Sequence, residues 1–437
     1  MLQKVKNFIA THQLIDKSDK IALAISGGKD SVFAAHALSQ MEVPFVMVHL
    51  NFKLRGEESD NDEKFVLNLG ANLPMCQAVF TKSVDTQAYA NQHKLNTQLA
   101  AREIRYAYFE KLYADGVYTK MITAHHQDDS IETFFINLNR GAGIRGLKSI
   151  PKKRDHYIRP FLALSQEEIL DYLKTNNIAH RQDASNASLK YERNKWRNVT
   201  LPKLYEEVPS LQQNVLHSVE QLQAENTLLD HLLDSVIDQL VYQIGKTQTI
   251  DKQKLVTYPQ AGVILYRILD TYGFSYAQCL QIIDTNTTTG AIFRSATHTL
   301  FLDRETFILE PITSEQIEEI EIPSTGKYSL GSSTITLSKT NQLVFVEDKN
   351  QETVSIPAEL FPLTLRTWKA GDRIQPLGMK GSKLLSDFFI DQKINTLNKH
   401  KIPLVCKDDE VLWICGMRVS EKLRATEGAD IYMLSIE

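Results

Sequence analysis

The residue run with the clearest chemical meaning is Ser26-Gly-Gly-Lys-Asp-Ser31. It follows an apolar run, Ile21–Ile25, and precedes a pattern typical of a helix. Two adjacent glycines let the backbone turn sharply and approach a ligand closely. The amides of such a turn and the positive end of the helix then face an anion. The run therefore predicts a phosphate-binding loop between a strand and a helix.

The side chains of this loop suit nucleotide phosphates. Ser26 and Ser31 supply hydroxyl donors, Lys29 supplies positive charge, and Asp30 can hold Mg²⁺ through oxygen. The pattern GxxxxGK[ST] is absent from the chain, and the loop is not GxGxxG. Neither a Walker A loop nor a dinucleotide site is therefore expected.

Acidic residues cluster after a later apolar run, in Thr123-Ala-His-His-Gln-Asp-Asp-Ser-Ile-Glu-Thr133. Asp129 and Glu132 are three residues apart, so a helix places them on one face. Acids at a helix start are also ordinary capping residues. Beside a phosphate loop, however, clustered carboxylates can bind metal or grip an ammonium group, and we favour that interpretation.

Two basic segments are further candidates for a site. Ala101-Arg-Glu-Ile-Arg-Tyr106 puts Arg102 and Arg105 about one helical turn apart, where solvated surface charge is the alternative reading. Arg140-Gly-Ala-Gly-Ile-Arg-Gly-Leu147 is a glycine-rich basic loop suited to phosphate or to an RNA backbone.

Strands and helices must alternate to position these residues. The expected strands are nearly continuous in apolar residues, as strands buried on both faces of a parallel sheet should be. They are Ile21–Ile25, Phe45–Leu50, Met75–Phe80 and Met121–Ala124. The helical patterns between them are Ser31–Met41, Asp60–Leu69, Thr86–Tyr113 and Asp129–Leu138. Repeated β-α-β units predict a doubly wound parallel sheet with its ligands at the carboxyl ends of the strands.

The rest of the chain is less regular. Residues 211–240 predict one long amphipathic helix, and residues 258–285 predict two more. A hairpin pattern follows at 290–311, a β-rich stretch at 327–347, and a compact module with short strands and a helix at 383–390. We therefore expect a mainly helical middle domain and a small α+β C-terminal domain.

The length of the chain indicates several domains, and the distribution of its charge indicates a polyanionic partner. A chain of 437 residues is too long for one ordinary core. The net charge is only −4, but residues 140–203 hold 14 Lys and Arg against 6 Asp and Glu, and residues 363–424 hold 12 against 7. The segment between, 205–330, holds 7 against 17. Basic segments on both sides of an acidic middle favour a grip on a polyanion, with chance unevenness as the alternative.

Cysteine spacing argues against a zinc-binding or redox protein, and hydropathy argues against a membrane or secreted one. Cys76, Cys279, Cys406 and Cys415 form no C-x-x-C pair and have no ligand at zinc spacing, so reduced, mostly buried thiols are expected. No apolar run approaches the roughly 18 residues that a membrane helix needs, and the first residues lack the features of a secretory signal. The sequence predicts a cytoplasmic protein without membrane contact and leaves its oligomeric state open.

The string Ser-Gly-Gly-Lys-Asp-Ser resembles the loop of the PP-loop ATP pyrophosphatases. In that superfamily the loop holds the β- and γ-phosphates, which leave together. The resemblance therefore implies that ATP and Mg²⁺ are used, and that a substrate oxygen attacks the α-phosphate to form an adenylate and release pyrophosphate.

All of these segments together resemble the tRNA(Ile)-lysidine synthetase family. The likeness extends through Arg159-Pro160, Asp183-Ala-Ser-Asn186 and Tyr191-Glu-Arg-Asn194 to Arg197, about the first 205 residues. Gly371-Asp-Arg, Pro376-Leu-Gly and Lys383-Leu-Leu-Ser-Asp-Phe-Phe389 resemble the terminal RNA-binding domain of that family. The resemblance implies a catalytic domain at 1–205, a connector and substrate-binding domain at 206–325, and a tRNA-binding domain at 326–437, with its compact part at about 360–437.

The implied reaction joins free lysine to the wobble cytidine of an isoleucine tRNA with a CAU anticodon. ATP adenylates O2 of the base, and the side-chain amine of lysine then attacks C2 and expels AMP, giving lysidine. Asp129 and Glu132 would hold and activate lysine, with Asp128 sharing that role or helping Asp30 with the metal. Arg105 would position the carboxylates or the α-phosphate. The residues expected to contact tRNA are Arg145, Arg193, Asn194, Arg197, Arg373 and Lys383.

The sequence departs from the family pattern at Phe52 and Lys53, where a histidine and a glycine are usual, and at Gln98, where an acid is common. Tyr191 and Trp196 could stack on a base or lie in a core, and His49 could bind nucleotide or pack.

Two rival functions remain. A PP-loop tRNA thiolation enzyme would need placed cysteines, and a non-catalytic tRNA-binding protein would bind tRNA without releasing pyrophosphate.

Overall fold

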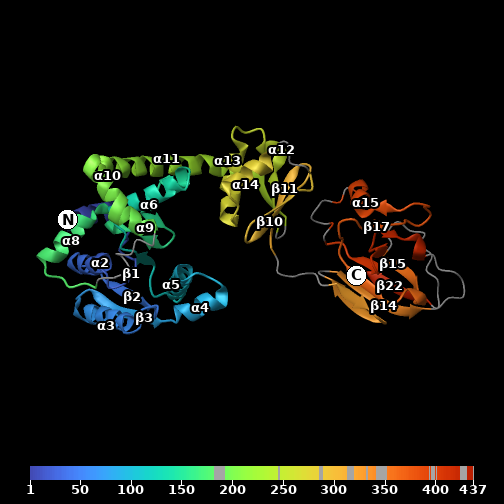
Figure 1. Cartoon of the computed structure of the whole chain (residues 1–437), viewed down its shortest axis with the longest axis horizontal. Coiled ribbons are helices and arrows are strands. Elements are labelled where there is room, and N and C mark those ends of the chain that lie inside the picture. The colour runs from blue at the N-terminus through green and yellow to red at the C-terminus, as the bar shows by residue number, and fades with distance from the viewer. Residues whose placement is uncertain are drawn as a thin grey trace. The chain divides into compact units, whose positions relative to one another are not determined.

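The computed structural model divides the chain into two compact units, Met1–Asp230 and His231–Glu437, each described by itself (Figure 1). The residues described are 1–181, 192–244, 247–284, 289–312, 319–330, 333–340, 352–392, 394, 399, 401–423 and 431–436. None of the helices formed by these residues is both long enough and apolar enough to cross a membrane.

A six-stranded sheet in the order β3-β2-β1-β4-β6-β5 forms the centre of the first unit. All neighbouring pairs are parallel except β5 and β6, which form an antiparallel hairpin at one edge. The expected doubly wound parallel sheet is confirmed, with the edge hairpin as an addition. The strands are β1 Ile21–Ala24, β2 Phe45–Asn51, β3 Cys76–Ser83, β4 Lys120–Ile122, β5 Lys153–Arg154 and β6 Tyr157–Ile158.

Helices connect and cover these strands. They are α1 Leu2–Thr11, α2 Lys29–Gln40, α3 Glu57–Asn72, α4 Thr86–His93, α5 Thr97–Ala114, α6 Gln127–Asn139, α7 Ile144–Leu147, α8 Gln166–Thr175, α9 Glu192–Lys195, α10 Leu201–Glu207 and α11 Leu211–Leu240. Shorter turns of helix are η1 Pro160–Ala163 and η3 Trp196–Thr200, the latter with π-type bonding.

The prediction of one helix over Thr86–Tyr113 is wrong. Helix α4 ends at His93, and its C-cap residue Lys94 has a left-handed backbone with φ 54°. Helix α5 then begins after Asn96, whose side chain accepts a hydrogen bond from the Leu99 amide. A left-handed residue stops a helix and an Asn cap starts one, so two local signals override a continuous apolar period.

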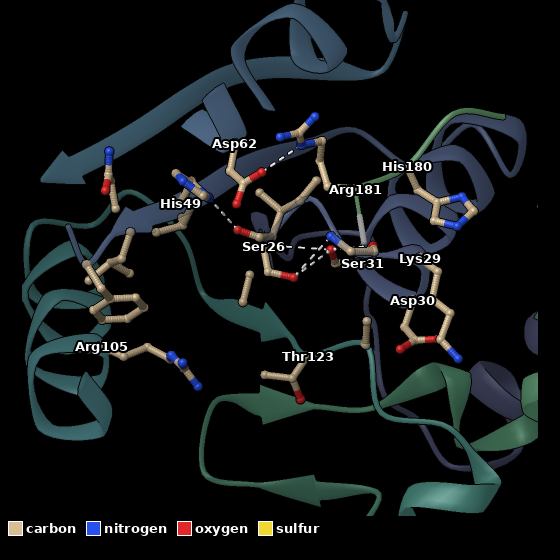
Figure 2. Close-up of a pocket in the computed structure, with 18 of the residues that line it drawn as sticks. Ser26, Lys29, Asp30, Ser31, His49, Asp62, Arg105, Thr123, His180 and Arg181 are labelled. Carbon is tan, nitrogen blue, oxygen red and sulfur yellow. Dashed lines mark hydrogen bonds and ion pairs between the residues drawn. The ribbon is translucent and has the colours of Figure 1, made fainter. Parts of the chain in front are cut away.

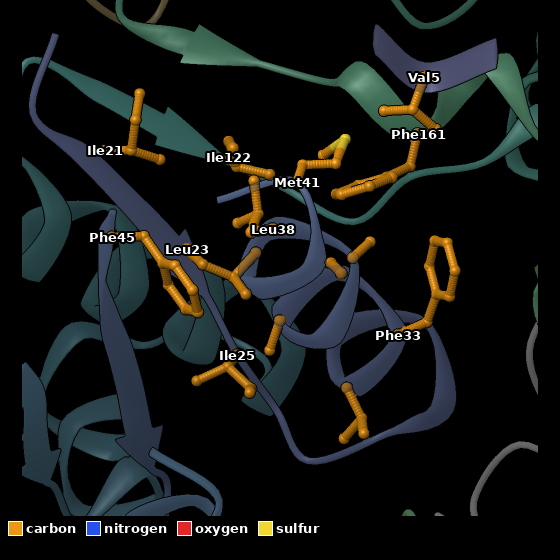
Figure 3. Packing of buried hydrophobic residues seen from close by; sticks show 14 of the residues in the cluster. Val5, Ile21, Leu23, Ile25, Phe33, Leu38, Met41, Phe45, Ile122 and Phe161 are labelled. Atoms are coloured by element: carbon orange, nitrogen blue, oxygen red, sulfur yellow. The ribbon is translucent and has the colours of Figure 1, made fainter. Parts of the chain in front are cut away.

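Apolar side chains cover both faces of the sheet. Leu23 and Ile122 pack with α2 side chains such as Phe33 and Leu38 on one face (Figure 3). Ala22 belongs instead to the cluster of Val48, Ile104 and Met121 on the other face. Burial on both faces explains why the central strands read as continuous apolar runs rather than alternating ones.

In the second unit the strands β7 and β8 come first and are followed by three helices, α12 Lys252–Leu255, α13 Ala261–Leu269 and α14 Tyr276–Ile283, with the turn η4 Asp270–Tyr272. With them lies a five-stranded antiparallel sheet in the order β7-β8-β11-β10-β9. One cluster of buried side chains joins helices and sheet, including Leu265, Cys279, Leu300 and Phe307. The strands are β7 Val241–Ile244, β8 Thr247–Asp251, β9 Ile292–Arg294, β10 His298–Leu302 and β11 Thr306–Pro311.

The remaining residues form three small sheets, ordered β12-β16-β19-β20-β21, β13-β14-β22-β15 and β17-β18. Helix α15 spans Leu385–Asp391, two residues later than predicted, because Lys383 and Leu384 pair with Arg373 and Ile374 as strands. The elements are β12 Ile320–Ile322, β13 Gly326–Leu330, β14 Ser333–Thr340, β15 Thr353–Pro357, η5 Ala358–Leu360, β16 Leu363–Arg366, β17 Arg373–Ile374, β18 Lys383–Leu384, β19 Leu404–Lys407, β20 Glu410–Ile414, β21 Arg418–Val419, η6 Glu421–Leu423 and β22 Ile431–Ile436.

Candidate active site

The loop from Ser26 to Gly28 joins the end of β1 to the start of α2, as the sequence predicts (Figure 2). Gly27 has φ +88°, a conformation that residues with a Cβ rarely adopt. Gly28 caps α2 with an ordinary φ of −73°, and a Cβ there would meet only the Ser26 hydroxyl within 4 Å. Gly27 therefore serves the turn, whereas Gly28 leaves the backbone open to a ligand.

Hydroxyl groups close this loop on itself. The Ser31 hydroxyl donates to the Gly28 carbonyl at 3.0 Å and lies 3.2 Å from both the amide and the hydroxyl of Ser26. Ser31 is buried, and the Gly28 amide donates to the Ser26 hydroxyl. Both serines thus hold the shape of the loop, a role in addition to the predicted contact with phosphate.

Lys29 and Asp30 form the first turn of α2, and their charges face each other at 4.0 Å. Burial lowers the pKa of Lys29, and Asp30 opposes that shift. Burial raises the pKa of Asp30, while His126 and Lys29 oppose it. The buried Oδ1 of Asp30 has no hydrogen-bond partner, so it is an oxygen atom available to a cation.

His126 links the phosphate loop to the acidic helix α6, and sequence reasoning assigned it no role. It is the N-cap of α6 and is almost fully buried. Its Nε2 lies 3.8 Å from Asp30 and 3.5 Å from Asp129, and its Nδ1 lies 3.4 Å from Asp128. Burial alone would lower the pKa of His126, but these three carboxylates raise it. Its position between a strand end and two acids was the signal available in the sequence.

The three acids of α6 have different surroundings. Asp128 accepts a hydrogen bond from the Gln166 amide at 2.7 Å, so it fixes the start of α8. Burial would raise the pKa of Asp128, but the contact with His126 and the Gln166 amide lower it. Asp129 caps its own helix by accepting from the His126 amide, and Glu132 is 1% exposed. Burial opposes ionisation of Asp129, yet His126 and Arg193 lower its pKa overall.

Two arginines from α9 and η3 clasp these acids. Arg193 Nε donates to Glu132 at 2.7 Å, and its Nη2 lies 3.1 Å from Asp129. Arg197 donates to Glu132 through Nε at 2.5 Å and to Asp129 through Nη2 at 2.8 Å. Burial would lower the pKa of Arg197, but its hydrogen bond to Glu132 raises it. The structure thus brings residues predicted to contact tRNA against those predicted to hold lysine.

Arg105 lies on α5 across the cavity from the loop (Figure 2). Its guanidinium is 5.4 Å from the centre of the Phe52 ring, and burial lowers its pKa. Arg102 lies 4.8 Å from the centre of the Tyr106 ring. Phe52, one of the departures from the family pattern, therefore provides an aromatic platform for Arg105 through a cation–π contact.

Two cavities meet at the phosphate loop. The larger, of about 1360 Å³, is lined by the loop, the end of β2, α5 and Arg181. The smaller, of about 520 Å³, is lined by acids that include Asp128, Glu132, Glu167 and Asp171. Lys29 and Arg197 line both cavities, so these two cationic side chains lie where the cavities adjoin. The large cavity suits a nucleotide, and the small acidic one suits an amine.

The other predicted contacts for tRNA lie elsewhere. Arg145 is half-buried in the short helix α7, and Asn194 is half-buried in α9. In the second unit, Arg373 and Lys383 lie on the paired short strands β17 and β18. Arg373 donates to Ser382, and Lys383 forms an ion pair with Asp391 of α15.

Trp196, for which base stacking and core packing were both possible, packs among apolar side chains. Trp196 stacks on Phe135, with ring centres 5.4 Å apart, inside a cluster with Ile131 and Leu201. It is therefore a core residue. Tyr191 and the segment 183–186 lie outside the described residues.

Comparison with known proteins extends over the whole chain. Residues 1–204 match the PP-loop domain, residues 243–312 the TilS substrate binding domain, and residues 363–436 the TilS substrate C-terminal domain. The chain is 34% identical to the tRNA(Ile)-lysidine synthase of Parabacteroides distasonis, over 98% of this chain and 97% of that protein. It is 32% identical, with the same coverage, to the tRNA(Ile)-lysidine synthase of Porphyromonas gingivalis strain W83. For that of Bacteroides thetaiotaomicron the identity is 31%, over 97% of both chains. With a phosphate loop at the carboxyl edge of a parallel sheet and relatives matched from end to end, the chain belongs to the tRNA(Ile)-lysidine synthase family.

Proposed function

We propose that this chain is a ligase that joins free lysine to C2 of the wobble cytidine of the CAU-anticodon isoleucine tRNA. The observation that carries the proposal is the match with named tRNA(Ile)-lysidine synthases over nearly the full length of both proteins. In the first step O2 of the cytosine attacks the α-phosphorus of ATP and pyrophosphate leaves. In the second step the lysine amine forms a bond to C2, loses a proton, and AMP leaves with the former O2.

The loop Ser26–Ser31 supports the first step. A glycine turn and the start of α2 direct backbone amides at one point, and Lys29 adds a cation there. A pyrophosphate leaving group gains negative charge as its bond to the α-phosphorus breaks, so fixed positive groups lower the barrier. We assign the β- and γ-phosphates to this loop and the nucleoside to the large cavity.

Asp30 fits a magnesium ion. Within the described residues no group of three or more His, Cys, Asp or Glu side chains is arranged so that it could hold a metal ion by itself. Mg²⁺ does not need such a group, because it commonly binds one or two carboxylates together with substrate phosphates and waters. Asp30 offers a buried oxygen with no hydrogen-bond partner beside the loop. Bound with ATP, the ion would supply neutralisation of phosphate charge.

The acids of α6 support the second step. An amine with a pKa near ~10.4 is protonated at neutral pH, so it must lose a proton before it attacks. In this proposal Glu132 and Asp129 receive the lysine ammonium. Arg193 and Arg197 now occupy these carboxylates, so lysine binding competes with them or shares the acids with them. Asp128 is held by Gln166, which suits a supporting role more than direct proton transfer.

The remaining parts follow from this assignment. We propose that residues 1–205 catalyse the reaction, that 206–325 and 326–437 bind the tRNA, and that the protein works in the cytoplasm, where its substrates are.

The cysteines disfavour the alternative that the chain is a tRNA thiolation enzyme. Cys279, Cys406 and Cys415 are buried, and burial raises the pKa of the half-buried Cys76, which disfavours a reactive thiolate.

The decisive test is incorporation of labelled lysine into isoleucine tRNA by the purified chain, with ATP and without it. We expect incorporation only with ATP, with AMP and pyrophosphate as products. Products of ADP and inorganic phosphate would contradict the proposal, as would tRNA binding with no pyrophosphate release, which would favour a non-catalytic protein.

A further inference from the structure

Arg159 is a buried arginine that no acidic side chain compensates. It directly follows β6 and is only 8% exposed. Its Nη1 donates to the Pro151 carbonyl at 2.8 Å, whereas its buried Nε has no hydrogen-bond partner. In the part of the chain that the structure describes, no carboxylate forms an ion pair with it. A buried charge without a partner is costly, so this guanidinium is suited to an anion that the fold itself does not supply.

The neighbouring charges add to this cost. Burial lowers the pKa of Arg159; Tyr106 opposes the shift, but Arg154 and Arg102 lower the pKa further. Arg102 lies over the Tyr106 ring and forms no ion pair with a described residue. Arg154 lies 3.7 Å from Asp155, but both side chains are about three-quarters exposed, and such a pair is weak. We name Arg102, Arg154 and Arg159 the arginine cluster.

The arginine cluster adjoins the large cavity. Arg102 and Tyr106 line this cavity from α5. The Thr123 amide donates to the Ile158 carbonyl at 3.1 Å, which ties the end of β6 to the end of β4, where Thr123 lines the same cavity (Figure 2). Arg154 belongs instead to the exposed strand β5 at the edge of the sheet. The cluster therefore extends from the cavity wall to the outer edge of the sheet.

This extent favours one kind of anion. The terminal phosphates of ATP are assigned to the loop after β1, and β4 separates β1 from β6 in the sheet. Neighbouring strands lie roughly 4.8 Å apart, so β6 is about 10 Å from the strand that carries the loop. The carboxylate of lysine is a single small group. A polynucleotide carries a phosphate at every residue, so a nucleotide whose base enters the cavity has further phosphates outside it.

We propose that the arginine cluster binds the RNA backbone beside the reacting base, with Arg159 and Arg102 at one phosphate of the anticodon loop and Arg154 at a neighbouring one. Guanidinium groups bind phosphate oxygens through directed N–H groups, and the phosphate supplies the negative charge that Arg159 lacks. The inference rests on the proposed function in naming tRNA as the anion.

The test measures retention of the isoleucine tRNA on filters by the full-length chain, without ATP or lysine, over a range of salt concentrations. Arg159→Gln should bind about tenfold more weakly. Arg159→Gln and the exposed Arg102→Gln should each reduce the salt slope by up to about 1. Lys111→Gln, exposed at the other end of α5, is the matched control and should keep the wild-type slope. Wild-type slopes in both arginine variants would overturn the proposal.

Ethylation of single tRNA phosphates separates phosphate binding from a structural role of Arg159 at Pro151. Each ethyl group removes the charge of one phosphate. In the wild type, ethylation of one phosphate in the anticodon loop should weaken binding, and in Arg159→Gln the same ethyl group should weaken binding much less. A structural role would lower affinity without singling out a phosphate, so equal losses in both proteins at every phosphate would overturn the proposal.

The other anions and the proposed reaction give distinct outcomes. A higher KM for lysine or ATP in Arg159→Gln, with an unchanged salt slope for tRNA, would assign the cluster to that substrate and overturn the proposal. A wild-type chain that forms lysidine while its arginine variants keep the wild-type slope sinks the cluster alone. A wild-type chain that binds tRNA through the cluster but forms no lysidine sinks the proposed reaction and leaves the cluster standing.

Discussion

Individual side chains in this site are defined by which charges they face. Asp30 and Glu132 are both acids of the candidate site, yet one oxygen of Asp30 has no hydrogen-bond partner, whereas Glu132 is held by two arginines. Asp30 faces Lys29 and His126 without a hydrogen bond to its buried oxygen, which is therefore open to a cation from solution. Glu132, in contrast, is neutralised inside the protein by its two arginines. This difference gives each residue its own test.

Replacing Asp30 with Asn should reduce AMP formation about a hundredfold or more, because the variant keeps the shape of the side chain but loses the charge proposed to hold Mg²⁺. Binding of tRNA, measured by filter retention, should remain nearly normal. Turnover close to that of the wild type would remove Asp30 from the metal site.

Replacing Glu132 with Gln should raise the KM for lysine about tenfold or more and change the KM for ATP little. The reason is that a carboxylate–ammonium contact in a buried site is lost, whereas the phosphate loop is untouched. Steady-state kinetics with each substrate varied will measure the two effects. Glu192→Gln, an exposed acid paired with Arg140, is the control. An unchanged KM for lysine would contradict the assignment.

His125 should make stability depend on pH. Burial lowers its pKa to about 4 from the ordinary 6.5. Between these values the unfolded chain binds a proton that the folded chain does not, so the free energy of unfolding falls as pH decreases from 6.5 to 4. The wild-type free energy of unfolding should fall by on the order of 3 kcal/mol between pH 6.5 and pH 4. The free energy of unfolding of His125→Gln should fall by less over the same pH range.

Denaturant unfolding of both proteins at several pH values checks this sign. His231→Gln, at an exposed position of α11, should behave like the wild type. The same pH slope in wild type and His125→Gln would show that His125 does not remain neutral in the folded protein.

At the scale of elements, helices α6, α9 and η3 are joined by charge and by packing. Arg193 and Arg197 reach Asp129 and Glu132, while Trp196 stacks on Phe135 of α6. A helix of four residues has little stability of its own, so these contacts hold α9 in place. The same contacts place the two arginines against Asp129 and Glu132, the acids that were expected from the sequence to hold the substrate lysine.

Removing Arg197 should therefore destabilise the fold. Arg197→Ala leaves Glu132 buried with part of its compensation gone, and breaking a buried pair costs about 3 kcal/mol. Urea unfolding will measure this loss of stability. The control Arg140→Ala, whose partner Glu192 is exposed, should cost under about 1 kcal/mol.

The double variant Arg193→Ala with Arg197→Ala tests contact with RNA. We expect it to weaken tRNA binding and its dependence on salt, and an unchanged salt slope would exclude both arginines from the interface.

At the scale of the molecule, the proposed chemistry lies in Met1–Asp230 and two predicted tRNA contacts, Arg373 and Lys383, lie in His231–Glu437. Chemistry and RNA affinity should therefore be separable by mutation. Arg373→Ala with Lys383→Ala should weaken tRNA binding and reduce its salt slope by up to about 2, while pyrophosphate binding stays constant. Lys4→Ala, on α1, is the control. Equal salt slopes would place these residues outside the interface.

The sequence by itself determined the central fold and the position of the loop that is proposed to bind phosphate. Continuous apolar runs at Ile21 and Phe45 predict buried parallel strands, and Gly27 and Gly28 predict the loop between β1 and α2. These features are local, because strand burial, glycine turns and helix starts depend on residues near one another in the chain. The division of Thr86–Tyr113 into two helices is also local, because the side chain of Asn96 caps α5.

Only the tertiary structure decided which charges meet. Arg193 and Arg197 lie more than 60 residues from Glu132, and Arg181 lies 119 residues from Asp62. No spacing rule links such residues, since their meeting depends on how the whole sheet and its helices pack. The sequence therefore supplied the groups that are proposed to bind phosphate and lysine, and the fold determined which of them compensate one another.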